Sequence, residues 1–201
     1  MSRYQYCVLL LLVTLIFNSY SLDSFFRKIG STLSNTRGAA MAASKYPIYC
    51  EENVMSKKAH GTCEKPVMKK LRWGCDWNTA DRICCFNRHY AEHAGYWLET
   101  KFLTEVDRSG ETTYFDSVTG KPLFIAPRGR TFEEFQKESK SHGWPSFRDE
   151  EVVWENVRCL SNGEAVSVDG THLGHNLPDR SGNRYCINLV SVAGSPDSKD
   201  L

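Results

Sequence analysis

The carboxyl-terminal half of the chain alternates short apolar runs with polar turns, which is the pattern of an antiparallel sheet. Gly120 supplies the unusual backbone angle of a first hairpin turn, and the Asn162–Gly163 pair forms a second turn. A polar loop at 178–183 then leads into a closing strand. We expect strands at 112–116, 122–126, 152–160, 165–175 and 184–193.

Two further segments show the spacing of an amphipathic helix. The first runs from an expected cap, Thr79, through residue 97, with apolar residues at helical intervals at Ile83, Phe86, Tyr90 and Ala94. The second, 131–143, opens with a Thr131–Glu134 capping box and stops at its terminal glycine. The sequence therefore predicts a mainly β (α+β) fold with short helices at its amino-terminal side.

Composition limits the size of this fold and the class of its partners. With 201 residues, 41% of them hydrophobic and 12% aromatic, the chain can bury one sizeable core and carry an extension. The net charge of +1 gives no global electrostatic attraction to nucleic acid or to an anionic membrane. We expect a monomer that binds no nucleic acid.

The amino terminus has the composition of a targeting segment. Residues 1–21 are expected to be a signal peptide, whose apolar stretch is too short for a permanent anchor, so no stable membrane insertion follows its removal. Residues 22–46 carry four cations and many small residues, but after Asp23 no acid, as in a transit peptide or a flexible leader. We expect entry into the secretory pathway. The destination is either a plastid, by a bipartite signal, or the extracellular or endomembrane lumen.

Cysteine usage points to one thiol in particular. Removal of the signal peptide leaves seven cysteines, and an odd number leaves one unpaired in an oxidising compartment. Strand alternation puts Arg184, Cys186 and Asn188 on one face of the closing strand. Cys186 therefore shares its surroundings with a cation and an amide, whereas a structural cysteine is usually buried among apolar neighbours.

Four short motifs carry a family resemblance. The stretches "TGKPLF" (119–124), "GWPSF" (143–147), "HLGH" (172–175) and "RYCIN" (184–188), in this order, make the chain resemble the MsrB-type peptide-methionine (R)-S-oxide reductases over roughly 85–193. The resemblance implies two antiparallel sheets of the β-tent type. It also implies a catalytic domain at 98–194, a Cys-rich segment at 47–97 packed on it, and a flexible tail at 195–201.

The resemblance implies that Cys186 is the nucleophile, attacking the sulfoxide sulfur as a thiolate that the charge of Arg184 favours. His172, His175 and Asp179 would polarise and protonate the departing oxygen. The product would be methionine and a Cys186 sulfenic acid. The implied activity is thiol-dependent reduction of methionine-R-sulfoxide in proteins, with free methionine sulfoxide a poorer substrate.

Other positions would bind the substrate. Trp144 resembles the family's tryptophan that forms an apolar wall for the terminal methyl group of the substrate, and Phe147 belongs to the same motif. Asn188 would orient the substrate or the thiol by hydrogen bonding. His172 and His175 are three residues apart and would face opposite sides of a regular strand. A bulge or twist at Gly174 must therefore bring both toward Cys186.

The chain departs from the family in two respects. Many members hold a structural zinc with two Cys-x-x-Cys pairs, but here those positions are Asp116, Thr119, Val166 and Asp169, so we expect no zinc there and no bound cofactor. His142 stands where many members place the resolving cysteine. Cys159 is the first candidate to replace it, with Cys84, Cys85 and Cys63 as rivals. Otherwise thioredoxin, glutaredoxin or a small thiol would reduce Cys186 directly.

Three other interpretations remain open at this point. The chain could be a β-tent binding module without catalysis. It could be a general thiol-disulfide oxidoreductase that uses Cys84 and Cys85. A metal could also be held by one of the cysteines Cys75, Cys84 and Cys85 together with His89 and His93, which are four residues apart.

Overall fold

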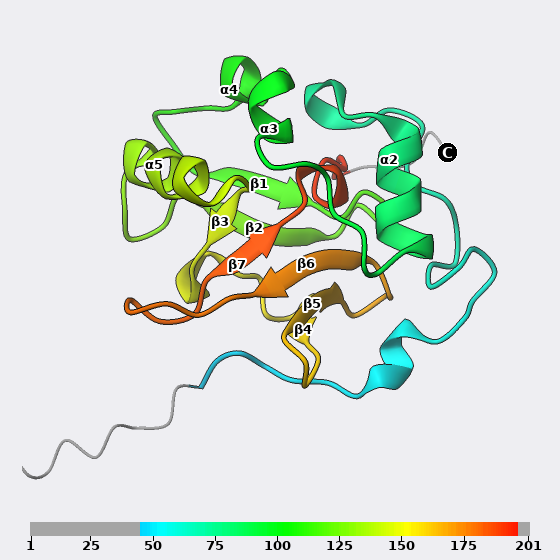
Figure 1. Ribbon diagram of the computed structural model, residues 1–201. Helices are drawn as coiled ribbons and strands as arrows, with labels where there is room; N and C mark the ends of the chain where they lie inside the picture. The colour runs from blue at the N-terminus through cyan, green and yellow to red at the C-terminus, as the bar shows by residue number, and fades with distance from the viewer. Residues whose placement is uncertain (1–44, 197–201) are drawn as a thin grey trace, which may run out of the picture. The chain divides into compact units, whose positions relative to one another are not determined.

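Two antiparallel sheets organise residues 45–196, the part of the chain that the computed structural model describes (Figure 1). The smaller sheet is the hairpin of β1 (Thr112–Phe115) and β2 (Pro122–Ala126). The larger has the strand order β3-β7-β6-β5-β4. Its strands are β3 (Ser146–Phe147), β4 (Val157–Cys159), β5 (Glu164–Ser167), β6 (His172–Asn176) and β7 (Tyr185–Ile187). The predicted mainly β fold is confirmed at this level.

Short helices complete the fold. The α-helices are α2 (Trp77–Asp81), α3 (Tyr96–Glu99), α4 (Phe102–Glu105) and α5 (Phe132–His142), and η3 (Arg82–Phe86) is a π-helical continuation of α2. Single 3₁₀ turns are η1 (Glu52–Met55), η2 (Arg72–Gly74), η4 (Asp149–Glu151) and η5 (Leu189–Ser191). Within residues 45–196, no helix has the length and apolar character to cross a bilayer. The expected signal peptide, residues 22–44 of the leader and residues 197–201 of the tail lie outside the described residues.

The predicted helix at 79–97 is wrong at both ends. Asp76 is the cap, because its Oδ1 accepts hydrogen bonds from the backbone N–H and the hydroxyl of Thr79 at 2.8 and 2.7 Å. The helix ends at Phe86, and residues 87–95 form a loop. The backbone N–H groups of His89 and Glu92 bond to side-chain oxygens of two asparagines instead of helical carbonyls. These local bonds stop the helix although the apolar spacing continues.

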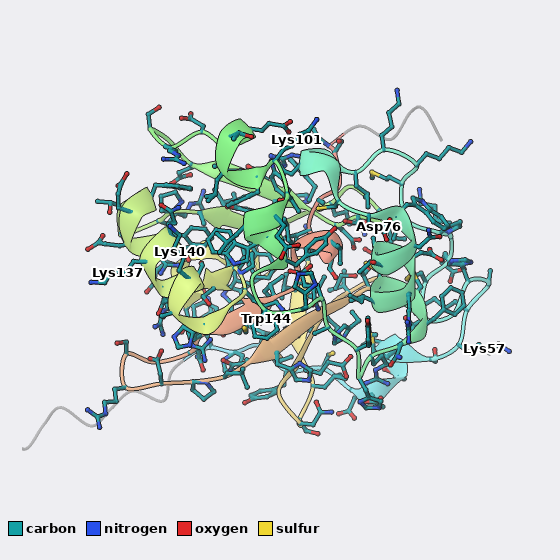
Figure 2. All side chains as sticks on the ribbon, turned by 45° about the horizontal axis from the view of Figure 1, so that its top comes forward. Lys57, Asp76, Lys101, Lys137, Lys140 and Trp144 are labelled. Carbon is teal, nitrogen blue, oxygen red and sulfur yellow. A yellow bond between two sulfur atoms is a disulfide. The ribbon has the colours of Figure 1, made fainter. Side chains whose placement is uncertain are left out.

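The predicted helix at 131–143 is confirmed with its cap. Thr131 Oγ1 accepts from the N–H of Glu134, and Glu134 Oε2 accepts from the N–H of Thr131. Gly143 ends the helix at φ +91°, and a Cβ there would lie 2.9 Å from Cβ of Ala94. In Figure 2, Lys137 and Lys140 extend outward from this helix, whereas Trp144, just beyond its end, lies over the larger sheet.

An aromatic core lies beneath β3 and the β1–β2 hairpin. Phe147 stacks on Phe124 with ring centroids 4.3 Å apart and meets Tyr114 edge-on at 5.0 Å. Trp73 and Trp97 of the Cys-rich segment belong to the same cluster of buried residues. The segment 47–97 and the sheets therefore share one hydrophobic core.

The closing strand is shorter than predicted. Of the expected 184–193, only Tyr185–Ile187 is strand, and the 3₁₀ turn η5 follows. The buried carboxylate of Glu92 accepts hydrogen bonds from the N–H groups of Leu189 and Val190 at 2.8 and 3.2 Å. Because these amides point at one carboxylate, they cannot continue a sheet ladder.

Hydrogen bonds and an ion pair join the turn that contains Asp116 to the turn that contains Asp169. Fully buried Asp116 accepts from the N–H of Val118 at 2.8 Å and from the hydroxyl of Thr171 at 3.0 Å. At the surface, Lys121 Nζ lies 2.9 Å from Asp169 Oδ2. These contacts link the β1–β2 turn to the β5–β6 turn.

Replacing Asp116 with alanine should lower the free energy of unfolding by about 2–4 kcal/mol, because two buried donors would lose their acceptor. Urea unfolding monitored by tryptophan fluorescence measures the change. The matched control is Asp169→Ala, which removes an exposed ion pair and should cost less than about 1 kcal/mol. Equal losses in the two variants would contradict a central role for the buried carboxylate.

Candidate functional site

The candidate site lies on one face of the larger sheet. Ser146 pairs with Cys186, Cys186 with His175, and His175 with Glu164, so these residues form one row across β3, β7, β6 and β5. Directly paired residues of antiparallel strands point to the same face. Cys186 and His175 are therefore adjacent on the face opposite Tyr185 and the aromatic core.

A bulge in β6 adds the second histidine to this face. Ala165 pairs with Gly174 and Val166 with His172, which leaves Leu173 as an extra residue. The rings of His172 and His175 meet edge-on with centroids 5.8 Å apart. A Cβ on Gly174 would lie 2.1 Å from the carbonyl oxygen of Cys186, so the close approach of the two strands here requires glycine. The predicted irregularity near Gly174 is confirmed.

A cavity of about 390 Å³ opens over these side chains. It is lined by Arg88, His89, Tyr90, Ala91, Trp144, His172, Gly174, His175, Leu177, Cys186 and Asn188. The structure thus brings Cys186, both histidines, Asn188 and Trp144 together. The loop 87–95, which the sequence had placed in a helix, supplies the opposite wall.

The same loop fixes two of the predicted site residues. The indole N–H of Trp144 donates to the backbone oxygen of Glu92 at 3.0 Å. Asn188 accepts from the backbone N–H of Glu92 at 3.1 Å and donates to the oxygen of Leu173 at 3.1 Å. Asn188 is therefore engaged with backbone groups on both sides, and it holds the loop against the end of β7.

Glu164 is a site residue that the sequence analysis missed. Its carboxylate accepts from Nδ1 of His172 at 2.8 Å and from Nε and Nη2 of Arg88 at 3.0 and 2.6 Å. Burial alone would raise the pKa of Glu164, but these hydrogen bonds lower it to about 2. An ionised carboxylate can only accept, so Nδ1 of His172 carries the hydrogen in this bond.

Burial opposes the thiolate that the sequence predicts at Cys186. Burial raises the pKa of the thiol, and the nearby charge of Arg184 offsets this only in part, so the net shift is upward. Burial, followed by the charge of His172, lowers the pKa of His175. At neutral pH the resting pair is therefore a thiol and a neutral imidazole.

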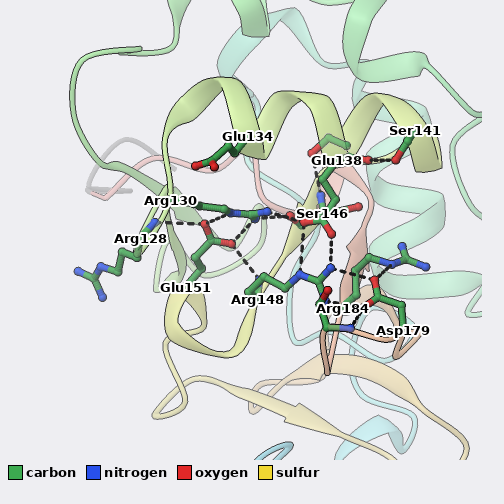
Figure 3. Close-up of polar contacts among 12 residues, drawn as sticks. Arg128, Arg130, Glu134, Glu138, Ser141, Ser146, Arg148, Glu151, Asp179 and Arg184 are labelled. Atoms are coloured by element: carbon green, nitrogen blue, oxygen red, sulfur yellow. Dashed lines mark hydrogen bonds and ion pairs between the residues drawn. The ribbon is translucent and has the colours of Figure 1, made fainter.

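Asp179 does not belong to the cavity. Its carboxylate is held by Arg148 at 3.1 and 2.8 Å and lies 3.5 Å from Nε of Arg184 (Figure 3). The hydrogen bonds from Arg148 lower the pKa of Asp179 to about 2. Asp179 is ionised at neutral pH and cannot donate the proton assigned to it; its contacts instead hold Arg184 through an ion-pair network that reaches Glu138 on α5.

Phe147 and Cys159 lie on the opposite face. Phe147 is fully buried in the aromatic core and does not line the cavity, so a substrate-binding role is wrong. Cys159 pairs with Ala165, which pairs with Gly174, which pairs with Ile187. It therefore lies three strands, roughly 14 Å, from β7, on the core face, and cannot reach Cys186 without rearrangement.

The remaining cysteines do not reach the cavity either. Cys63 and Cys85 form a disulfide. Cys84 is fully buried, and its thiol donates to Ser191 Oγ at 3.5 Å. Within residues 45–196 the cavity holds no cysteine other than Cys186. A dithiol reaction of Cys84 with Cys85 does not fit this arrangement, because one sulfur is bonded elsewhere and the other is sealed.

The suggested metal ligands His89 and His93 do not share a helical face, since their segment is a loop. His93 instead pairs with Glu99 at 3.0 Å.

No protein-family model matches the chain. The interpretation of the cavity therefore depends on its own residues.

Replacing Glu164 with glutamine should lower the free energy of unfolding at pH 7 by about 3 kcal/mol, because the guanidinium of Arg88 would lose its buried charged partner. The depressed pKa means that Glu164 stabilises the protein fully above pH 4.5 and progressively less as the pH falls toward 2. Between pH 4.5 and pH 2 the free energy of unfolding should therefore change less in the Glu164→Gln variant than in the wild-type protein. Glu52→Gln, on the exposed side of Arg88, is the control and should retain the wild-type profile, as measured by urea unfolding at each pH.

Alkylation of Cys186 tests the role of Arg184. Because burial raises the pKa of the Cys186 thiol, the rate of labelling by iodoacetamide should continue to rise with pH beyond the ordinary thiol pKa of 9.0. Arg184→Ala should slow labelling at pH 8 by roughly three- to tenfold, and Arg184→Lys should restore part of the rate. Site-resolved mass spectrometry gives the rates, with exposed Arg180→Ala as the control; an unchanged rate in Arg184→Ala would contradict the assignment.

Proposed function

We propose that the protein reduces methionine-R-sulfoxide in oxidised proteins, as the resemblance to the MsrB-type reductases implies, on a fold of the β-tent type. The observation that supports this most is the meeting of Cys186, His172, His175 and Trp144 in one cavity. A nucleophile, two proton-carrying rings and an apolar wall are the groups that sulfoxide reduction needs. A binding module needs no thiol at this position.

The reaction transfers one oxygen atom between two sulfurs. Cys186 loses its proton to an imidazole and attacks the sulfoxide sulfur, while the sulfoxide oxygen takes up a proton and moves to the cysteine. The products are methionine and a Cys186 sulfenic acid, so the substrate sulfur is reduced and the thiol sulfur is oxidised. His175, paired directly with Cys186 and neutral at rest, is suited to take the first proton.

Arg184 and the Glu164–His172 pair would assist this transfer. Arg184 is 8% exposed, and its Nη1 has no hydrogen-bond partner among the described residues, so this nitrogen is available to stabilise a thiolate as it forms. The Glu164 carboxylate would stabilise His172 when that ring is charged. The geometry thus favours proton transfer on substrate binding over a thiolate that exists beforehand.

Regeneration then requires an external thiol. Because the cavity holds no second cysteine within the described chain, a thioredoxin-like protein or a small thiol would attack the sulfenic acid. The first thiol forms a mixed disulfide with Cys186 and releases water. A second thiol restores Cys186 and leaves as the oxidised disulfide.

Cys186→Ser should abolish reduction of a methionine-R-sulfoxide peptide supplied with dithiothreitol, since serine cannot accept the oxygen atom. Chromatography of the peptide measures turnover. Wild-type protein should consume the R epimer and leave the S epimer unchanged. Cys50→Ser, a free cysteine outside the cavity, is the control and should keep wild-type activity. Equal consumption of both epimers, or activity in Cys186→Ser, would refute the proposal.

A further inference from the structure

A second cluster of reactive side chains lies outside the cavity, around the Cys63–Cys85 disulfide. We propose that His60, Cys63, Asp81 and Cys85 form a zinc site when this disulfide is reduced, so that the same residues are joined by a covalent bond in one redox state and by a metal ion in the other. This site is distinct from the positions at which relatives hold zinc.

The backbone presents these residues as two closely spaced pairs. His60 and Cys63 face each other across a tight turn, in which the N–H of His60 donates to the oxygen of Cys63 at 2.8 Å and the N–H of Cys63 donates back at 3.0 Å. Asp81 and Cys85 are four residues apart on the continuous α2–η3 helix. Two residues separate the first pair and three separate the second. Zinc fingers arrange their ligands in the same way, with one closely spaced pair on a turn and one on a helix.

The donor atoms are already close together. One ligand atom each from His60, Asp81 and Cys85 lies within 4.8 Å of the others, and Cys63 is bonded to Cys85. His60 Nε2 lies 2.9 Å from both carboxylate oxygens of Asp81. Tetrahedral zinc with bonds of about 2.0–2.3 Å separates its ligand atoms by roughly 3.3–3.8 Å. Breaking the disulfide and moving these side chains slightly would give that spacing.

Burial and charge also suit a metal. Both sulfurs belong to residues that are 1% exposed, whereas the His60 side chain is 26% exposed. His60 and Cys85 line an open cavity of about 600 Å³, which gives a reductant and an ion a route inward. Zinc with two thiolates, one carboxylate and one neutral imidazole carries a net charge of −1. Lys58, whose ammonium group binds the carbonyls of Val54 and Thr62, lines the same cavity and adds a positive charge to it.

The exchange balances chemically. Two equivalents of an external thiol reduce the disulfide to two thiols and leave as one disulfide. Zn²⁺ then displaces the two thiol protons and binds without changing its oxidation state. Either linkage ties the 60–63 turn to the helix that leads into Arg88 and the wall of the first cavity.

The test measures metal binding, not activity. The full chain carrying Cys186→Ser is reduced with a phosphine, desalted anaerobically and mixed with Zn²⁺ or Co²⁺. We expect one equivalent of zinc by atomic absorption after reduction and none before it, and a thiolate-to-cobalt charge-transfer band with intense tetrahedral d–d absorption. His60→Ala and Asp81→Ala should bind at least about tenfold more weakly.

Matched variants make the outcome decisive. Cys63→Ser with Cys85→Ser should abolish binding, whereas Cys50→Ser and the exposed His93→Ala should keep it. His60→Ala can still form the disulfide, so it separates loss of a ligand from failure to fold, which circular dichroism checks. Absence of zinc from the reduced protein, or equal binding by the oxidised protein or by the double serine variant, would overturn the proposal.

Discussion

The contact on which the site depends is the close approach of Gly174 to the carbonyl of Cys186. With no Cβ at residue 174, strand β6 can lie against β7 while it accommodates one extra residue, Leu173. The bulge returns His172 to the face that already carries His175 and Cys186. A regular strand would have placed one imidazole in the aromatic core and left the thiol with a single histidine neighbour.

Around this bulge, several polar groups of the site are held by partners that are themselves buried or paired. Glu164 fixes the tautomer of His172, and Arg88 fixes Glu164 from the other side. Asp179 holds Arg184 from outside the cavity, and Arg148 links Asp179 to α5. Such a network keeps a charged side chain beside a half-buried thiol without leaving isolated charges in the interior.

The Cys-rich segment contributes more than a covering for the sheets. Its helix α2–η3 leads into the loop that forms one wall of the cavity, and Glu92 of that loop binds both Trp144 and the start of η5. The disulfide and the His60–Asp81 pair anchor the middle and the end of the same helix to the 60–63 turn. The shape of the cavity therefore depends on residues far from the motifs that first drew attention to it.

The sequence by itself determined what local interactions decide. The capping box of α5 and the hairpin turns at Gly120 and Gly163 involve residues a few positions apart, and the motif order pointed to Cys186, His172, His175, Asn188 and Trp144. Only the tertiary structure decided what depends on contacts between distant segments. Glu164 reaches His172 through a register that the bulge sets, Cys159 falls on the core face, and Glu92 ends the last strand early. These outcomes follow from strand register and burial, and neither can be calculated from the spacing of residues along one segment.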